Sequence, residues 1–220
     1  MSGRLSAVIF DLDGTLADSI SDIAGSVNHV LARRGWPNHS SASYRQFIGE
    51  GLEVLIRRAL PPGHEASIPE LVGEYRIHYA DHFADTSTLY PGIASLLDRL
   101  TALSCPMAIL SNKREDFTQA FVARLFPRWK FEAVRGERAT VPRKPDPTAA
   151  LEVARVLRLE PSRCAFVGDT RIDMETATGA GMFPVGVSWG FRDREELVAH
   201  GAKAVIDSPL ELLPILDGTG

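Results

Sequence analysis

Residues 7–16 carry the sequence AVIFDLDGTL, in which an apolar run passes abruptly into two carboxylates. A short, continuous apolar run of β-branched and aromatic residues is typical of a strand buried on both faces, as in the parallel sheet of an α/β protein. Ligands of such sheets bind beyond the carboxyl ends of the strands. The sequence therefore places Asp11 and Asp13 where a ligand is expected, and Gly14 allows the backbone to turn sharply beside it.

Composition and charge narrow the possible partners and location. The chain has 220 residues, of which 45% are hydrophobic and 24% are charged, as in an ordinary globular protein. Its net charge is -4 and its basic residues are scattered, which argues against nucleic acid as a partner. No apolar run approaches the roughly 20 residues that span a bilayer, and Asp11 comes too early for a signal peptide's apolar stretch. We therefore expect a cytoplasmic protein with no membrane partner, in which Cys105 and Cys164 stay reduced.

The chain changes its periodicity after the first strand. Apolar residues recur at helical spacing within residues 20–31, 52–60 and 71–83, and no strand is predicted between residues 17 and 88. Strands that alternate with amphipathic helices are then predicted at residues 107–110, 131–134, 164–167, 183–187 and 204–206. This alternation predicts an α/β fold with a parallel sheet and right-handed crossovers. We expect a Rossmann-like core of residues 1–16 and 89–220, with an inserted helical cap of residues 17–88.

Polar residues that can carry chemistry follow three of the predicted strands. Since parallel strands lie side by side, their carboxyl ends are expected to meet at one crevice. Lys144 lies just ahead of a predicted helix in the same half of the chain and could reach that crevice. The strand-end residues are Asp11 and Asp13, then Ser111, Asn112 and Lys113, then Asp169, with Asp173 one helical turn later.

Four carboxylates in one crevice repel one another and cannot all stay ionised without cations. Carboxylate and carbonyl oxygens suit a hard ion, and a site that also holds phosphate oxygens and water favours Mg²⁺ over Ca²⁺. Mg²⁺ and the Lys144 ammonium together reduce the negative charge of the four carboxylates from four to about one, so that a phosphate can approach. These residues therefore predict a site of phosphoryl transfer. One carboxylate can be the nucleophile, and a second acid can protonate the leaving alkoxide and later activate water.

The order and spacing of these residues resemble a known family. DLDGT at residues 11–15, Ser111, Lys144, and GDT at residues 168–170 with Asp173 resemble the four motifs of the haloacid dehalogenase superfamily. Within that superfamily, the chain is similar to the phosphoglycolate phosphatases in its inserted helical cap and in the segments FIGEG (47–51), LYPG (89–92) and SNK (111–113). The resemblance covers almost the whole chain. It implies the haloacid dehalogenase fold and Mg²⁺-dependent hydrolysis of a small phosphomonoester, first 2-phosphoglycolate, through an aspartyl-phosphate.

The resemblance also implies roles for the acidic residues and the lysine. By this resemblance, Asp11 would be the nucleophile and a Mg²⁺ ligand, and Asp13 would be the general acid and base, whose backbone carbonyl would also bind the metal. Asp169 would bind Mg²⁺ directly, and Asp173 would bind it directly or through water. Lys144 neutralises the phosphate and the aspartyl intermediate. Members that cleave carbon-halogen bonds lack the second aspartate, so that Asp13 favours the phosphatase branch.

Other residues are implied in binding phosphate and the leaving group. Thr15 and Ser111 would bind the phosphoryl oxygens, with help from the amides around Gly14 and Asn112. A helical cap would exclude water from the crevice and select the leaving group. Its substrate-facing loop is expected at Gly49, Glu50 and Gly51. If the substrate is phosphoglycolate, one cap cation should bind its carboxylate, and the sequence leaves open whether this is Arg45, Arg57 or Arg58.

Several alternatives remain beside this interpretation. The Asp11 segment lacks the glycine that a calcium-binding loop needs at its sixth position, where Leu16 stands. His78 and His82, spaced i and i+4, could bind a metal, but no third ligand is evident. A sugar phosphatase, a pyrophosphatase or a β-phosphoglucomutase-like enzyme would share all four motifs. A catalytically silent protein that binds a phosphorylated ligand or a partner is the alternative of another class. A monomer and a homodimer are equally compatible with the sequence.

Overall fold

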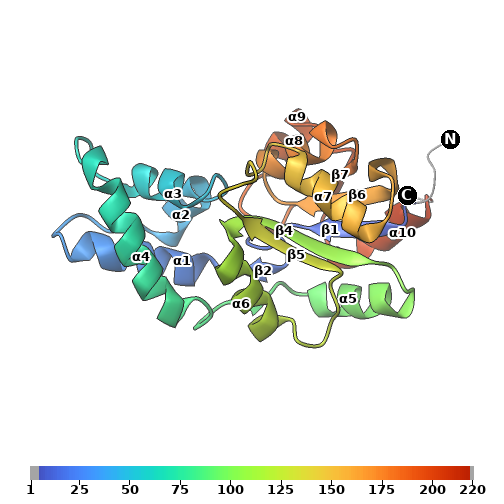
Figure 1. The fold of residues 1–220 in the computed structure, drawn as a ribbon, viewed down its shortest axis with the longest axis horizontal. Helices are drawn as coiled ribbons and strands as arrows, with labels where there is room; N and C mark the ends of the chain where they lie inside the picture. Colours follow the sequence, from blue (N-terminus) through green and yellow to red (C-terminus); the bar gives the residue numbers. More distant parts are fainter. Residues whose placement is uncertain (1–4, 219–220) are drawn as a thin grey trace.

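The computed structural model describes residues 5–218 and contains a parallel sheet of six strands (Figure 1). The strand order is β5-β4-β1-β6-β7-β8, so that β1 lies between β4 and β6. This order brings the carboxyl ends of three site-bearing strands together, and the expected α/β fold is confirmed. The strands are β1 (Ala7–Phe10), β4 (Met107–Arg114), β5 (Ala133–Glu137), β6 (Cys164–Gly168), β7 (Phe183–Val187) and β8 (Ala204–Ile206).

Helices cover both faces of the sheet. Alternate residues of β1 point to opposite faces, so that Val8 and Phe10 join one apolar cluster while Ala7 and Ile9 join another. The first cluster includes residues of α5 (Ile93–Ala102), α6 (Glu115–Leu125) and α10 (Leu212–Asp217). The second includes residues of α7 (Thr148–Leu157) and α8 (Arg171–Gly179), beside which lies α9 (Arg194–Ala199). Single 3₁₀ turns occur at Glu65–Ser67, Pro161–Arg163 and Pro209–Glu211.

Four further helices lie beyond the carboxyl edge of the sheet, at the left of Figure 1. They surround a third apolar cluster, to which Phe191 from the loop after β7 also belongs. Val27, Leu71 and Tyr79 are almost completely buried in this cluster. The helices are α1 (Ile20–Ala32), α2 (Ser41–Phe47), α3 (Leu52–Ala59) and α4 (Ile68–His82).

Three strand predictions need correction. β2 (Ala17–Asp18) pairs antiparallel with β3 (Thr88–Leu89), so that the prediction of no strand between residues 17 and 88 is wrong at both of its ends. β4 continues to Arg114 instead of ending at residue 110, with a register shift between Leu110 and Arg114. β5 spans Ala133–Glu137 instead of 131–134. Its polar residues are accommodated because β5 is an edge strand.

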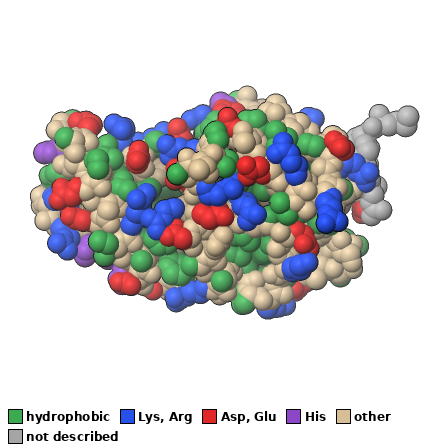
Figure 2. All heavy atoms as spheres, viewed as in Figure 1, with side chains coloured by type: hydrophobic (Ala, Val, Ile, Leu, Met, Phe, Trp, Pro, Cys, Tyr) green, Lys and Arg blue, Asp and Glu red, His purple; other side chains and the backbone are tan. Residues whose placement is uncertain are grey.

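Charged side chains of both signs alternate over the face of the molecule seen in Figure 2. Lys and Arg do not gather into one patch on that face, in agreement with the scatter of basic residues along the sequence. Within residues 5–218, no helix combines the length and apolar character needed to cross a bilayer.

Three imidazole rings stack along α1 and α4. The His29 and His78 ring centroids lie 4.0 Å apart, and those of His78 and His82 lie 4.3 Å apart. Within the described part of the chain, the arrangement needed for a three-ligand metal site is met by Asp11, Asp169 and Asp173, and the stack has no such arrangement. The stack is therefore a packing contact between two helices.

This stack is expected to make stability depend on pH. Burial and the two neighbouring imidazoles lower the pKa of His78 below its ordinary 6.5. Below about pH 6.5 the unfolded chain then binds more protons than the folded chain, so that the free energy of unfolding falls as the pH drops. Urea unfolding between about pH 7 and pH 5 should show a smaller loss for His78→Gln than for the wild type. Equal losses in the two proteins would exclude this role.

Candidate active site

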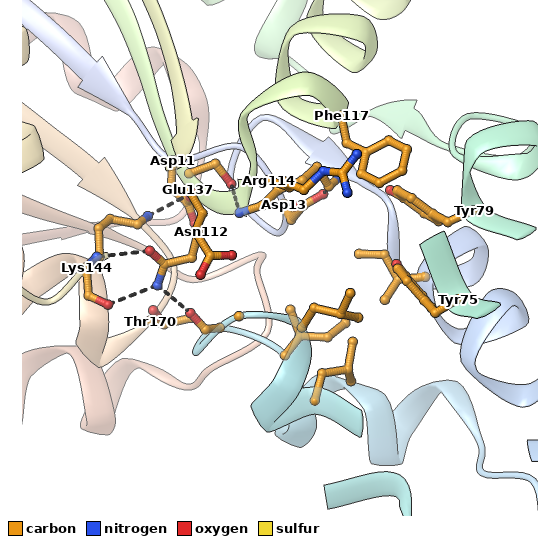
Figure 3. Close-up of a pocket in the computed structure, with 18 of the residues that line it drawn as sticks. Asp11, Asp13, Tyr75, Tyr79, Asn112, Arg114, Phe117, Glu137, Lys144 and Thr170 are labelled. Atoms are coloured by element: carbon orange, nitrogen blue, oxygen red, sulfur yellow. Dashed lines mark hydrogen bonds and ion pairs between the residues drawn. The ribbon is translucent and has the colours of Figure 1, made fainter. Parts of the chain in front are cut away.

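A pocket of about 800 Å³, including its open mouth, lies between the carboxyl ends of the central strands and helices α1, α3 and α4. In Figure 3, Asp11, Asn112 and Lys144 lie on the sheet side, while Tyr75 and Tyr79 of α4 face them from the opposite wall. The apolar part of the lining consists of Ile23, Ile48, Leu52, Leu55, Tyr75, Tyr79, Phe117 and Phe191. The pocket therefore joins a charged floor to a largely apolar wall.

Asp11 lies at the floor, directly after β1. Its amide donates to the Val167 carbonyl at 2.9 Å, which extends the β1 and β6 pairing by one residue. The Lys144 ammonium lies 2.9 Å from Asp11 Oδ1 and 2.7 Å from Asp173 Oδ1. Lys144 is almost fully buried, and although burial opposes its charge, Asp11 and Asp173 raise the pKa of the ammonium above its usual value. Lys144 therefore stays charged between the two carboxylates.

Asp169 lies beside them at the end of β6. Its Oδ1 accepts a hydrogen bond from the Thr15 hydroxyl at 3.0 Å, and its Oδ2 accepts one from the Phe191 amide at 2.8 Å. Asp173 is held in a similar way, since its Oδ2 accepts from the amide and hydroxyl of Thr170 in a capping box of α8. The Thr15 hydroxyl thus faces a carboxylate in this structure, and its implied phosphate contact stays a prediction.

The three carboxylates Asp11, Asp169 and Asp173 fit a divalent cation. One oxygen from each lies within 4.8 Å of the others, and all three residues are buried. Burial raises the pKa of Asp11 to about 7, and burial together with Asp173 and Asp11 raises the pKa of Asp169 well above its usual value. Lys144 alone therefore does not compensate the negative charge. A second cation beside these oxygens would favour their ionised forms, and an all-oxygen donor set suits a hard ion.

Asp13 follows Asp11 by two residues and also lines the pocket. Its Oδ1 accepts from the Lys113 ammonium at 2.6 Å and from the Ser19 hydroxyl. Lys113 Nζ also lies 4.2 Å from the centre of the Phe121 ring. No sequence motif indicates a role for Lys113 itself, although it is part of the SNK segment. The structure shows that Lys113 and Ser19 together orient the Asp13 carboxylate.

Asn112 of β4 connects this strand with the segments that hold Gly49 and Lys144. Its Oδ1 accepts from the Lys144 amide at 2.9 Å, and its Nδ2 donates to the Lys144 and Gly49 carbonyls, both at 3.0 Å. Its neighbour Ser111 lines the pocket, and the Ser111 hydroxyl accepts from the Lys113 amide at 3.2 Å. The Asn112 side chain therefore fixes the position of Lys144, while Ser111 is the closer candidate for a phosphoryl contact.

Gly14 is required by the way Asp169 packs. Its φ is +88°, and a Cβ on this residue would overlap the Asp169 carboxylate. Gly14→Ala is therefore expected to lower the free energy of unfolding by about 1–3 kcal/mol. Gly25→Ala in the middle of α1 is the matched control, because a Cβ there meets no atom within 4 Å. Urea unfolding should show a loss for the first variant and none for the second, and equal behaviour would contradict this account of Gly14.

The expected cap residues are only partly in the pocket. Gly49 and Gly51 line it, whereas Glu50 is outside the lining and pairs with Arg58 and Arg171, the latter at 3.0 Å. Arg45 is also outside, and its guanidinium donates to the Gly190 carbonyl at 2.9 Å. Arg57 and Arg58 do not line the pocket either. The contacts of Glu50 with Arg171 and of Arg45 with Gly190 attach the segment of residues 45–51 to α8 and to the loop after β7.

Two lining cations were not singled out from the sequence. Arg76 of α4 and Arg114 at the end of β4 both line the pocket. Arg114 binds Asp116 and lies 4.8 Å from the centre of the Phe117 ring. No motif identifies Arg76, because the rotation of α4 about its axis decides which of its side chains reach the pocket.

Comparison with known proteins places the chain in a family. Residues 8–187 match the family of haloacid dehalogenase-like hydrolases. Phosphoglycolate phosphatases from Pseudomonas putida and Chromobacterium violaceum are 35% and 32% identical, over 94% and 97% of this chain and 78% and 97% of theirs. A haloacid dehalogenase-like hydrolase from Streptococcus pneumoniae superposes with a TM-score of 0.87 at 27% identity, covering 96% of this chain and 98% of the other. The protein belongs to the haloacid dehalogenase-like hydrolases.

Proposed function

We propose that this protein is a Mg²⁺-dependent phosphatase that hydrolyses a small organic phosphomonoester, with 2-phosphoglycolate as the first candidate. The names of the relatives from P. putida and C. violaceum support this substrate. The observation that carries the proposal is the buried Asp11 carboxylate, which faces the pocket and lies 2.9 Å from the Lys144 ammonium. A carboxylate held against a fixed cation at the floor of a pocket is suited to accept a phosphoryl group.

Asp11, Lys144 and Asp13 each have a separate role in the proposed reaction. An Asp11 oxygen attacks phosphorus, the bond to the leaving oxygen breaks, and an aspartyl-phosphate forms. The Lys144 ammonium compensates charge on Asp11 and on the phosphoryl group. Asp13 gives its proton to the departing alkoxide, then takes a proton from the water that attacks the intermediate. Lys113 and Ser19 hold Asp13 in place for both steps.

Mg²⁺ would be held by Asp11, Asp169, Asp173 and the Asp13 carbonyl. When bound, it supplies positive charge that stabilises the phosphoryl oxygens in the transition state. Helices α1, α3 and α4, within the proposed cap of residues 17–88, supply the apolar wall that excludes water. The proposed role of Thr15, Ser111 and the amides near Gly14 and Asn112 is to bind the phosphoryl oxygens.

Phosphate release with and without Mg²⁺ tests the proposal. We expect release only with the metal, and a kcat/KM for 2-phosphoglycolate about a hundredfold above that for sugar phosphates, nucleotides and pyrophosphate, which corresponds to about 2.7 kcal/mol. If a sugar phosphate or pyrophosphate is the best substrate, the proposed mechanism stands, but 2-phosphoglycolate is not the preferred substrate. A need for a bisphosphate activator would indicate a mutase, and no release from any compound would indicate a silent binder. Cytoplasmic location and a monomeric or homodimeric state remain predictions from the sequence.

A further inference from the structure

Helix α4 presents three polar or aromatic side chains to the pocket. Tyr75, Arg76 and Tyr79 all line it, and their spacing of i, i+1 and i+4 places them on one face of the helix. Most of the remaining wall that the cap helices contribute is aliphatic. The α4 face is therefore where this wall can make polar contacts with a bound molecule.

Two donors on this face are buried and have no partner within residues 5–218. They are Arg76 Nε and the Tyr79 hydroxyl. Buried polar atoms in folded proteins are nearly always hydrogen-bonded, and one left unpaired costs free energy. Two such donors, three residues apart and lining the same pocket, indicate that their acceptor belongs to the bound ligand.

Arg76 also differs from the other cations that line the pocket. Lys113 pairs with Asp13, Lys144 pairs with Asp11, and Arg114 binds Asp116. Arg76 forms no ion pair with any residue that the structure describes, and a guanidinium stays charged in proteins. Its planar edge, formed by Nε and one terminal nitrogen, matches a carboxylate with two parallel hydrogen bonds. An anion is therefore the ligand group that it fits best.

The α4 face lies near Asp13, on the side where the leaving group must be. Lys113 Nζ, which pairs with Asp13, lies 5.5 Å from the centre of the Tyr79 ring. The Asp13 charge also adds to the effect of burial in raising the pKa of Tyr79 well above its usual value, so that this hydroxyl stays a donor. The part of a substrate that departs with a proton from Asp13 would then face α4.

We propose that Arg76 and the Tyr79 hydroxyl bind a carboxylate on the leaving group, so that the enzyme selects phosphoesters of hydroxy acids. This inference rests on the proposed phosphatase function and deepens it. It replaces Arg45, Arg57 and Arg58 as candidates for that contact, because none of the three lines the pocket. Arg76 and Tyr79 are specificity-determining residues in this account, and the chemistry at Asp11 does not require them.

The test compares 2-phosphoglycolate with 2-hydroxyethyl phosphate, in which a hydroxymethyl group replaces the carboxylate. The ratio of their kcat/KM values is measured for the wild type, Arg76→Gln and Tyr79→Phe. Arg33→Gln is the matched control, since it removes the same charge from an exposed position outside the pocket. We expect a wild-type ratio of about a hundred, and a fall of at least about tenfold in Arg76→Gln.

The two variants also separate ligand binding from a structural role. Tyr79→Phe should lower the ratio severalfold while its Tm stays equal or rises, because the removed hydroxyl has no partner among residues 5–218. In Arg76→Gln and Tyr79→Phe, kcat/KM should fall much further for 2-phosphoglycolate than for 2-hydroxyethyl phosphate, and Arg33→Gln should change neither value. A ratio that is unchanged in Arg76→Gln, or close to one in the wild type, overturns the inference and leaves the phosphatase function intact.

A different result would show that the phosphatase proposal itself fails. If the wild type releases phosphate from neither ester, calorimetric binding of 2-phosphoglycolate decides whether the subsite exists. Binding that weakens at least about tenfold in Arg76→Gln, but not in Arg33→Gln, supports a carboxylate subsite in a binding protein. Equal binding by all three proteins overturns it.

Discussion

Replacement of Asp11 by Asn is expected to lower kcat by about 10,000-fold or more while the protein stays folded. The amide has nearly the shape of the carboxylate but is a very poor nucleophile, so that no acyl phosphate can form. Burial raises the pKa of Asp11 to about 7, which means that the neutral amide avoids the cost of burying a charge. The Tm of the variant should therefore equal or exceed that of the wild type.

Phosphate release under saturating substrate measures this loss, and thermal unfolding is its control. Fluoride complexes of beryllium, which imitate the phosphoryl group on a carboxylate, should inhibit the wild type. They should not stabilise Asp11→Asn against heat. Activity of the variant within about tenfold of the wild type would show that another residue is the nucleophile.

Lys144→Met is expected to have the largest effect on stability. Lys144 is almost fully buried and pairs with Asp11 and Asp173, so that its removal leaves two buried carboxylates without their cation. Removing one partner of a buried ion pair costs about 3–5 kcal/mol. The free energy of unfolding in urea should fall by this amount, and phosphate release should be lost as well.

A double variant tests whether the unpaired carboxylates of Asp11 and Asp173 cause this loss of stability. The double variant Lys144→Met with Asp173→Asn removes one of the two orphaned charges, and we expect it to recover part of the stability. Mg²⁺ should stabilise Lys144→Met more than it stabilises the wild type, because the metal then compensates charge that the lysine no longer does. A loss below about 1 kcal/mol, or none recovered in the double variant, would contradict this account of Lys144.

The sheet and the carboxylate cluster could be predicted because local patterns specify them. The apolar run before Asp11 marks β1, and the runs before Ser111 and Asp169 mark β4 and β6. The strands predicted at residues 183–187 and 204–206 agree with β7 and β8 to the residue. The parallel arrangement then brings the strand ends together, which is why the expected neighbourhood of Asp11 and Asp169 appears in the structure.

Elements that depend on distant contacts could not be predicted in this way. The sequence SASYRQF of α2 has no apolar repeat, and the helix depends on the Ser40 cap and on the burial of Tyr44. β2 and β3 have two residues each, too few to show a periodicity. The pairing of Lys113 with Asp13 joins residues 100 positions apart, and only the folded chain brings them together.

The arginine that would bind the substrate carboxylate also could not be predicted from the sequence. The sequence does not choose among Arg45, Arg57 and Arg58 for this contact. Arg45 and Arg58 instead donate to backbone carbonyls, and Arg57 is exposed, while the pocket is reached by Arg76 from α4. Which arginine enters the pocket depends on helix packing, which sequence spacing does not encode.

The central claim is that Asp11 takes up the phosphoryl group, and a stalled enzyme tests it most directly. Acetyl phosphate has a good leaving group and needs no acid, so that Asp13→Asn should still transfer its phosphoryl group but fail to activate water for release. We predict that acid quenching followed by peptide mass spectrometry finds nearly one phosphoryl group per chain, located on Asp11. The double variant with Asp11→Asn should carry none. Phosphate on another residue, or turnover of acetyl phosphate by that double variant, would contradict the mechanism.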